Sequence, residues 1–440
     1  MLRRVLSLSL VAAAASATAV ATTPGPASAV PAGTDHVILW NEALRYAFTR
    51  VDLAPGPLTR RAAILNAAMY DTVASLSGSD TPYLGRVPKE PNFSYDVVLN
   101  IDAAARTVLP QLFPTVDFTA YYNEAAKYKP VGEPAPEGWS TSVGRGAAQR
   151  ILAARANDGS NNTTPYVEST APGQWRQTGS GPAATPNWGL VTPFTLTSGT
   201  QFRPPPPAGF SSISDLLASP QYAAQVNEVK SLGAVNSTTR TAEQTRIAFF
   251  WANDVAGTYK PPGQLLRHTA LIALDRNLDS GPAARLYTLV SLAMADAAIV
   301  AWDTKFRTPI DLWRPESAIR LADTDGNPAT EADPAWQPLS VDRNGVHFSP
   351  PFPAYTSGHA TLAGAWAGVM KRYFGTDNFT FRVDSADPNE MQYRTYTSFS
   401  AAAAENARSR VYLGVHYQFD ADFGLSSGDA VAAQAVSRLS

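Results

Sequence analysis

A short segment near the C-terminus combines side chains that suit the binding of a tetrahedral oxyanion. The run from Ser409 to Asp420 contains a hydroxyl, a guanidinium (Arg410), an imidazole (His416) and a carboxylate. An arginine can donate two parallel hydrogen bonds to such an ion, and an imidazole can attack or ligate its central atom. Asp420 follows His416 by four residues, so it could accept the other ring N–H and fix the tautomer. The pattern predicts an anion site that His416 faces with a free nitrogen lone pair.

Two upstream segments supply the remaining groups that such a site needs. Lys305 and Arg314 add an ammonium and a second guanidinium, and cations buried together need a compensating anion. In the segment 352–360, Gly358 lets a backbone N–H approach a ligand closely, and His359 titrates near neutral pH. We therefore expect three separated segments to converge on one oxyanion.

In these motifs the chain resembles the vanadium-dependent haloperoxidases, which share their site with type 2 phosphatidic acid phosphatases and bacterial acid phosphatases. The third family motif is Ser-Arg, then five residues, His, three residues and Asp. It is matched without exception by Ser409, Arg410, His416 and Asp420. Three motifs in the right order are a far more specific signal than any one of them.

The second family motif, Pro-Ser-Gly-His, is matched at three of its four positions. Ser357, Gly358 and His359 are present, and Thr356 stands in place of the proline. We expect this replacement to loosen the loop without removing a ligand.

The first family motif departs more from the pattern. The family usually has six residues between its lysine and Arg-Pro, whereas eight separate Lys305 from Arg314. We favour Lys305 because Trp302 precedes it by three residues, as in the fungal chloroperoxidases; a two-residue insertion would then bulge at Thr308-Pro309. Arg307 has the six-residue spacing and stays open as a substitute, with the same charge and a different reach.

The resemblance implies a vanadate cofactor and a haloperoxidase that oxidises halide with hydrogen peroxide to hypohalous acid, which halogenates an organic acceptor. The implied cofactor-binding residues are Lys305, Arg314, Ser357, Gly358, Arg410 and His416, with His416 as the ligand of vanadium. Lys305 would polarise peroxide, His359 would act as acid and base, and Asp420 would orient His416.

The shared motifs also allow a secreted acid phosphatase, in which His416 is the nucleophile and His359 protonates the leaving alcohol. Trp302 and Phe352 favour the peroxidase, because the fungal chloroperoxidases have a tryptophan and a phenylalanine beside the cofactor. The long helical N-terminal half is a second trait of the haloperoxidases.

The composition excludes several other classes of protein. A net charge of −2 and the absence of any Lys/Arg run longer than two residues disfavour nucleic-acid binding. The chain has no cysteine, which excludes disulfides and thiolate ligands. Beyond the N-terminus no stretch approaches 18 uninterrupted apolar residues, so we expect no membrane span.

The N-terminus is typical of a secretory signal. Arg3 and Arg4 precede an apolar stretch that ends near Ala21, and Ala27-Ser28-Ala29 forms a small-residue cleavage site. We therefore expect a secreted protein from which residues 1–29 are removed by cleavage near Ala29.

Helical periodicity dominates the regular parts of the sequence and predicts an all-α protein. The clearest segment, 284–305, has apolar residues at i, i+3 and i+4 spacing, so a buried helix would deliver Trp302 and Lys305 at its C-terminal end. The other predicted helices span residues 57–76, 99–112, 142–157, 243–256, 360–373, 398–412 and 428–439. We expect a helical region at 30–240 and a catalytic helical region at 241–440.

By resemblance, these helices form two packed bundles with the oxyanion site in the C-terminal one. Long loops rich in proline and glycine connect them, and the loop 323–353 should form one wall of the substrate entrance. An apolar helix face serves a core or a partner equally well, so a homodimer stays open.

Two residues outside the motifs carry further expectations. His347 precedes His359 by twelve residues on the predicted entrance loop, where it could tune halide access, although surface placement is the default. Asp296 stands alone in an apolar helix, so it should have a buried partner, for which we expect an arginine of the site.

Overall fold

The computed structural model describes residues 34–130, 139–179, 181–385 and 392–440. Within these ranges it contains fourteen α-helices and one antiparallel pair of strands, which confirms the predicted all-α class. The predicted signal segment, residues 1–29, lies outside the described residues. The helices of the first part are α1 (His36–Phe48), α2 (Pro55–Ser77), α3 (Val97–Leu112), α4 (Thr119–Ala125), α5 (Ser142–Ala154), α6 (Ile213–Leu217) and α7 (Pro220–Leu232). Those of the second part are α8 (Ala242–Phe250), α9 (Lys260–Asp275), α10 (Ser280–Arg307), α11 (Pro315–Arg320), α12 (Gly358–Phe374), α13 (Phe399–Tyr412) and α14 (Gln418–Arg438), with strands β1 (Asn378–Asp384) and β2 (Tyr393–Ser398).

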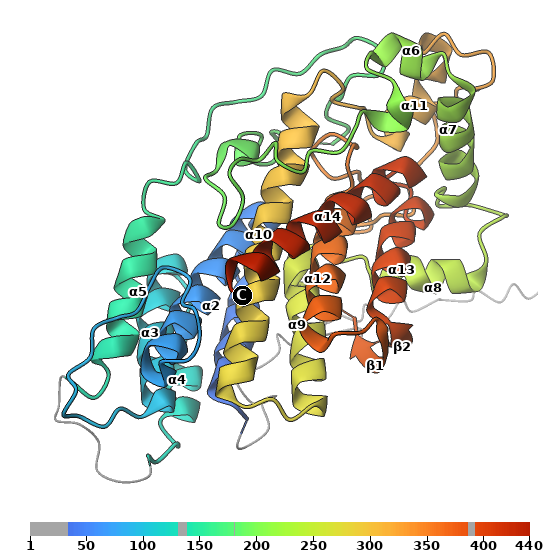
Figure 1. Cartoon of the computed structure of the whole chain (residues 1–440). Coiled ribbons are helices and arrows are strands. Elements are labelled where there is room, and N and C mark those ends of the chain that lie inside the picture. The colour runs from blue at the N-terminus through green and yellow to red at the C-terminus, as the bar shows by residue number, and fades with distance from the viewer. Residues whose placement is uncertain (1–33, 131–138, 180, 386–391) are drawn as a thin grey trace, which may run out of the picture.

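Helix α10 runs through the middle of the molecule and joins its two groups of helices (Figure 1). It packs on α2, which contacts α3 and α5, and also on α12 and α14. By length and composition α10 could cross a membrane, but 94% of its most apolar window is buried inside the protein. This burial is typical of a core helix, and it places α10 between the two predicted bundles.

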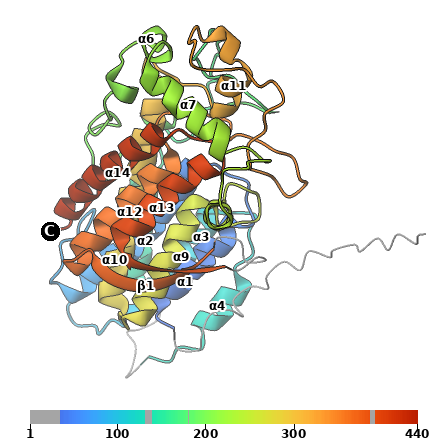
Figure 2. The same cartoon turned by 90° about the vertical axis from the view of Figure 1, so that its right-hand side faces the viewer.

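The second bundle is built on a close crossing of α12 and α14, which lie next to each other together with α13 (Figure 2). Two glycines allow the close approach. A Cβ atom on Gly364 would overlap the backbone of Leu425, and one on Gly428 would overlap the Thr361 carbonyl. Since α12 begins with Gly358 and α14 begins just after His416, this crossing fixes two of the predicted motifs relative to each other.

The ends of five helices, including the beginning of α12, bring the three motifs together. Lys305 lies in the last turn of α10, and Arg314 directly precedes α11. Arg410 lies in the last turn of α13, and a short turn through Gly414, which has a positive φ of 81°, leads to His416 before α14. Helix termini leave backbone groups unpaired, so these groups are available to a ligand or to the side chains of the site.

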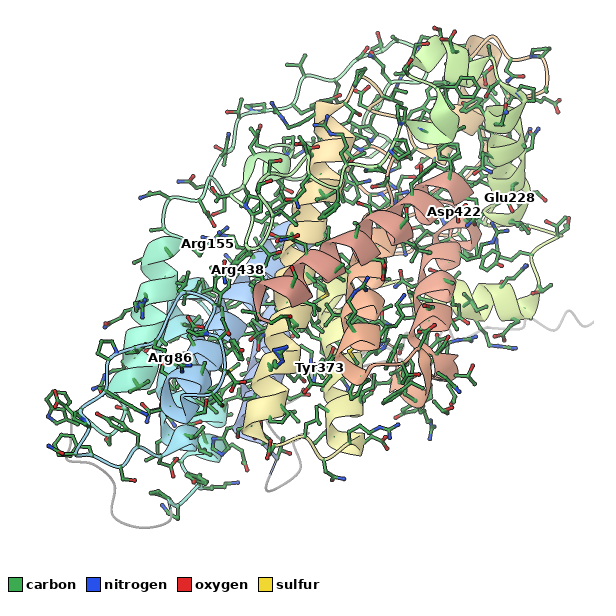
Figure 3. The ribbon with its side chains drawn as sticks, in the orientation of Figure 1. Arg86, Arg155, Glu228, Tyr373, Asp422 and Arg438 are labelled. Atoms are coloured by element: carbon green, nitrogen blue, oxygen red, sulfur yellow. The ribbon has the colours of Figure 1, made fainter. Side chains whose placement is uncertain are left out.

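The C-terminal helix is also tied to the first bundle. Arg438, near the end of α14, donates a hydrogen bond to the Tyr83 carbonyl at 2.9 Å, and the Tyr83 hydroxyl donates to the Phe194 carbonyl at 2.9 Å. The guanidinium of Arg155, which is labelled in Figure 3, lies over the Phe194 ring. These contacts link α14, the loop after α2 and the end of α5.

Several predicted boundaries were wrong. The helix predicted at 243–256 ends at Phe250, because Asn253 pairs with groups outside a helix and Gly257 has a φ of 80°. The helix predicted at 428–439 begins ten residues earlier, at Gln418. Helix α9 was not predicted, since Pro261-Pro262 is typical of a loop; both prolines lie in its first turn, where a missing N–H costs nothing.

Replacement of Gly428 by alanine should destabilise the crossing of α12 and α14. The added methyl group overlaps backbone atoms of Thr361 and Ala365, so the free energy of unfolding should fall by about 1–3 kcal/mol in urea titrations. Gly281→Ala is the matched control, because a Cβ there meets nothing within 4 Å. An equal effect of both variants would contradict this account of the crossing.

Candidate anion-binding active site

Six of the predicted site residues line one small cavity. Trp302, Phe352, Gly358, His359, Arg410 and His416 face it, together with Asp254 and the apolar residues Pro55, Pro261, Pro350 and Leu362. The Trp302 and Phe352 rings pack with their centroids 4.9 Å apart and form an aromatic wall. The three motifs therefore meet in space.

The hydrogen bonds of His416 define its tautomer. Nε2 lies 3.0 Å from Arg314 Nη1, and Nδ1 lies 2.8 Å from Asp420 Oδ2. An arginine only donates, so Nε2 must carry the lone pair and Nδ1 the proton. Asp420 Oδ2 also accepts from the Tyr417 N–H at 3.1 Å. Asp420 therefore orients His416 and caps α14 at the same time.

Arg314 is fully buried and only partly paired. Nε donates to the Phe352 carbonyl and Nη1 to the Val415 carbonyl, each at 2.7 Å. In the described part of the chain, Nη2 has no hydrogen-bond partner. A buried donor without a partner is costly, so Nη2 is available to a ligand.

Arg410 likewise combines a fixed contact with a free donor. Nη2 pairs with Asp254 Oδ2 at 2.6 Å, whereas Nε finds no partner among the residues that the structure describes. The ion pair with Asp254 does not remove Arg410 from the cavity, since both residues line it.

Lys305 and Arg307 lie in different surroundings. Lys305 is fully buried and Nζ donates to the carbonyls of Pro353 and Ala354, at 2.6 and 3.1 Å, and to that of Thr356. Nζ also lies 5.1 Å from the centre of the Phe352 ring. Arg307 is exposed at the end of α10. Thr308 and Pro309 lie outside the helix, as the predicted bulge requires.

The Ser357-Gly358-His359 motif forms the beginning of α12. Ser357 caps the helix by accepting from the Ala360 N–H, and its own N–H donates to the Asp420 carbonyl at 3.0 Å. The Gly358 N–H has no partner within the helix, as is usual for the first turn. We expected Thr356, in place of the family's proline, to loosen this loop. Lys305 donates a hydrogen bond to the Thr356 carbonyl, which holds the loop in place.

His359 has a partner that the sequence did not predict. Its Nε2 lies 2.7 Å from Asn253 Oδ1, and Asn253 Nδ2 donates to Gln264. The Asn253 oxygen accepts, so the His359 proton is on Nε2 and Nδ1 carries the lone pair. Asn253 lies in the irregular segment after α8, where no motif or periodicity pointed to this contact. For the neighbouring Asp254 the sequence had left open an ion pair with Arg314 or Arg410, and the pair with Arg410 is present.

Burial and the surplus of cations shift the pKa values of the site. Burial first, and then the Arg314 guanidinium, lower the pKa of Lys305 well below its usual value. Burial and Arg410 lower the pKa of His359 to about 3, and burial raises that of Asp420 to about 7. Burial raises the pKa of Asp254, but the interactions with the His359 ring and with the cations Arg410 and Lys260 lower this pKa overall.

The residues fit an oxyanion on two independent grounds. Three cations, Lys305, Arg314 and Arg410, face two carboxylates, so positive charge is in excess when both carboxylates are ionised and the histidines neutral. Arg314 Nη2 and Arg410 Nε are buried donors without partners in the described residues. Vanadate or phosphate would supply both the missing charge and the missing acceptors.

Asp296 and His347, the two residues outside the motifs for which we had expectations, lie away from the anion site. The predicted arginine partner of Asp296 was wrong, because its carboxylate accepts from the N–H groups of Phe194 and Thr195 and from the Thr195 hydroxyl. His347 bonds to the Ser340 carbonyl and does not line the cavity.

Comparisons with known proteins agree with this site. Residues 285–440 match the family model of the VCPO second helical-bundle domain. The resemblance predicted from the motifs is confirmed by the vanadium chloroperoxidase of Curvularia inaequalis, which is 30% identical over 287 residues. The match covers 54% of this chain and about half, 46%, of that relative.

Solved structures extend the similarity over almost the whole chain. The first bacterial vanadium-dependent iodoperoxidase superposes with a TM-score of 0.76 and 25% identity, covering 93% of this chain and 98% of that one. A holo-type bacterial vanadium-dependent chloroperoxidase gives a TM-score of 0.67 at 19% identity, covering 88% of this chain and 92% of that one. The second likeness supports the fold alone.

Oxyanion binding should be accompanied by proton uptake. A bound anion favours the charged forms of Lys305 and His359 and the protonated form of Asp420, so all three pKa values rise. Tungstate is a suitable probe because it stays a dianion at neutral pH. Calorimetry at pH 7.5 in two buffers of different ionisation enthalpy should show net uptake, reduced in Lys305→Met. Identical heats in both buffers would contradict the prediction.

Proposed function

We propose that this protein is a vanadate-dependent haloperoxidase, which oxidises halide with hydrogen peroxide to hypohalous acid. The observation that carries the proposal is one cavity lined by Arg410, His416 and the aromatic wall of Trp302 and Phe352. Buried next to these lining residues, Arg314 bonds to His416 and Lys305 Nζ lies 5.1 Å from the centre of the Phe352 ring. Arg314 and Arg410 each keep a buried donor that has no partner in the described residues. The similarity to vanadium chloroperoxidase and to a bacterial iodoperoxidase supports it.

In this proposal the cofactor is vanadate, held by Lys305, Arg314, Ser357, Gly358 and Arg410 and ligated by His416. When bound, vanadate supplies a Lewis-acidic centre that activates hydrogen peroxide toward halide. The protein contributes fixed donors and charges that need no rearrangement during the reaction. Asp420 keeps the Nδ1 proton of His416 in place, so that Nε2 carries the lone pair, which accepts from Arg314 in this structure and would ligate vanadium in the loaded enzyme.

His359 serves as the acid and base for the small reactants. Its bond to Asn253 holds the ring by Nε2 and leaves Nδ1 free to accept a proton at the cavity. A neutral imidazole is the form that the low pKa favours before the anion binds. His359 can therefore take a proton from hydrogen peroxide and return it to a leaving oxygen.

Replacement of Lys305 should abolish most halogenation, whereas replacement of Arg307 should not. Lys305→Ala removes a buried cation, so vanadate-dependent turnover of monochlorodimedone should fall by about 100-fold or more. The exposed Arg307 provides the matched control, since Arg307→Ala should keep nearly full activity. The reverse result would assign the first motif to Arg307.

The same preparation distinguishes the peroxidase from the phosphatase. A peroxidase should halogenate monochlorodimedone only after vanadate is added. A phosphatase would instead hydrolyse p-nitrophenyl phosphate through His416, and vanadate would inhibit it. Hydrolysis without halogenation would overturn the proposed function.

We also propose that the enzyme is exported and acts outside the cytoplasm, on the basis of the N-terminal pattern. Expression of the full chain in a secreting host should place the protein in the medium or periplasm, with a mature N-terminus near Val30. Intact-mass measurement checks this prediction. A cytoplasmic product that keeps residues 1–29 would count against export.

A further inference from the structure

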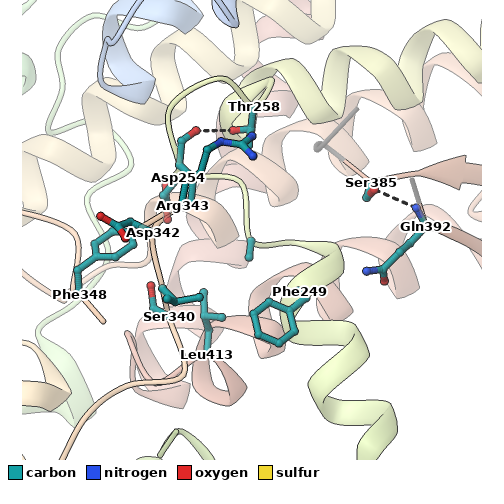
Figure 4. Close-up of a pocket in the computed structure, with 13 residues that line it drawn as sticks. Phe249, Asp254, Thr258, Ser340, Asp342, Arg343, Phe348, Ser385, Gln392 and Leu413 are labelled. Atoms are coloured by element: carbon teal, nitrogen blue, oxygen red, sulfur yellow. Dashed lines mark hydrogen bonds between the residues drawn. The ribbon is translucent and has the colours of Figure 1, made fainter. Parts of the chain in front are cut away.

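A second, larger cavity lies directly outside the anion site (Figure 4). Its volume is about 330 Å³, within the usual range for sites that bind small organic molecules. It is bounded by the end of α8, the segment after that helix, the loop 340–348 and the end of α13. None of the motif residues lines it.

The two cavities meet at Asp254, which lines both of them. On the inner side Asp254 pairs with Arg410 at 2.6 Å. On the outer side it lies near Thr258 and Arg343 (Figure 4). A molecule in the outer cavity would therefore be separated from the oxyanion by little more than one ion pair.

The outer cavity has an apolar part with two aromatic rings. Phe249 and Phe348 lie on either side of Ser340 and Leu413 (Figure 4). Phe249 is 39% exposed although it is a large apolar side chain at the end of α8. Exposed aromatic rings around a concave surface are typical of binding sites for rings, which pack against them edge-on or offset.

The polar part of the wall suits a hydroxyl group. Asp342 accepts from the N–H groups of Asn344 and Val346, each at 2.8 Å, which fixes its carboxylate on the loop. Arg343 is anchored across the cavity by a bond from Nε to the Ala256 carbonyl at 2.9 Å. Together with Asp254, these groups offer hydrogen-bond acceptors and a donor to a ring substituent.

We propose that the outer cavity binds the organic acceptor, and that it takes a phenol, with the ring between Phe249 and Phe348 and the hydroxyl toward the carboxylates. The proposal rests on the proposed function, which supplies hypohalous acid on the other side of Asp254. In the reaction, a ring carbon bonds to the halogen while the halogen–oxygen bond breaks. The ring proton leaves with the released hydroxide as water, so the phenol and HOX give the halophenol and H₂O.

Kinetics with two acceptors test this site. Phe249→Ala should raise the KM for phenol bromination about ten-fold, because an aromatic contact is lost. Turnover of monochlorodimedone at saturating concentration, which reports hypohalous acid formation, should stay within about two-fold of the wild type. Leu274→Ala is the matched control, since Leu274 is 36% exposed and lines neither cavity. An unchanged KM in Phe249→Ala would overturn the proposal.

Product ratios and direct binding complete the test. The wild type should give a ratio of ortho- to para-bromophenol that differs from the ratio given by authentic hypobromous acid. Saturation-transfer NMR, without vanadate or peroxide, should detect binding of phenol but not of cyclohexanol. Halogenation with the ratio of the free acid and no phenol signal would overturn the acceptor site and leave the proposed function intact. Phenol binding without any halogenation would overturn the acceptor role together with the proposed function.

Discussion

The excess of buried positive charge around one cavity is the constraint on which the site depends. Lys305, Arg314 and Arg410 are withdrawn from water, and each comes from a different helix end. Asp254 and Asp420 compensate only part of this charge. Burying a cation without a partner costs several kcal/mol, so we expect an oxyanion that binds here to stabilise the folded chain. Binding and stability are thus linked through the same contacts.

Backbone carbonyl groups hold the buried cations Lys305 and Arg314 in position. Three carbonyls of the segment before α12 accept from Lys305, and two further carbonyls accept from Arg314. Because carbonyl oxygens carry only partial charge, they hold the cations without neutralising them. The crossing of α12 and α14 then sets Asp420 beside Ser357. Cations that are fixed in this way can stabilise negative charge on a bound anion without rearrangement.

Contacts of the site could be predicted where the two residues lie close together in the sequence, and not where they lie far apart. Arg410, His416 and Asp420 occupy the end of one helix, a tight turn and the start of the next, so their spacing alone predicted the contact between His416 and Asp420. Lys305 and Arg307 could not be distinguished by spacing, since the answer depends on where α10 turns toward solvent. Trp302 precedes Lys305 by nearly one helical turn, which puts both on one face, while Arg307 falls on another.

The segment 251–259 shows why other contacts of the site could not be predicted from the sequence. Asn253 lies in an irregular segment without periodicity, and its contact with the site is made to His359, which lies more than 100 positions later. Asp254, in the same segment, could be named as a possible ion-pair partner of Arg410, but its place in the cavity wall could not. The partner of Asp296 escaped prediction for the same reason, because backbone N–H groups of a distant loop have no sequence signature.

In the proposed reaction the small reactants bind in the inner cavity and the larger organic acceptor binds in the outer one. The inner cavity is small and closed by Trp302, Phe352 and three prolines, which suits peroxide and halide but leaves little space for an organic molecule. The outer cavity has that space and an aromatic wall. Phosphate ester hydrolysis would need the ester's alcohol group to fit beside His359 itself. A small oxidant that forms inside and reacts outside needs no such fit, so the sizes of the two cavities favour the peroxidase over the phosphatase.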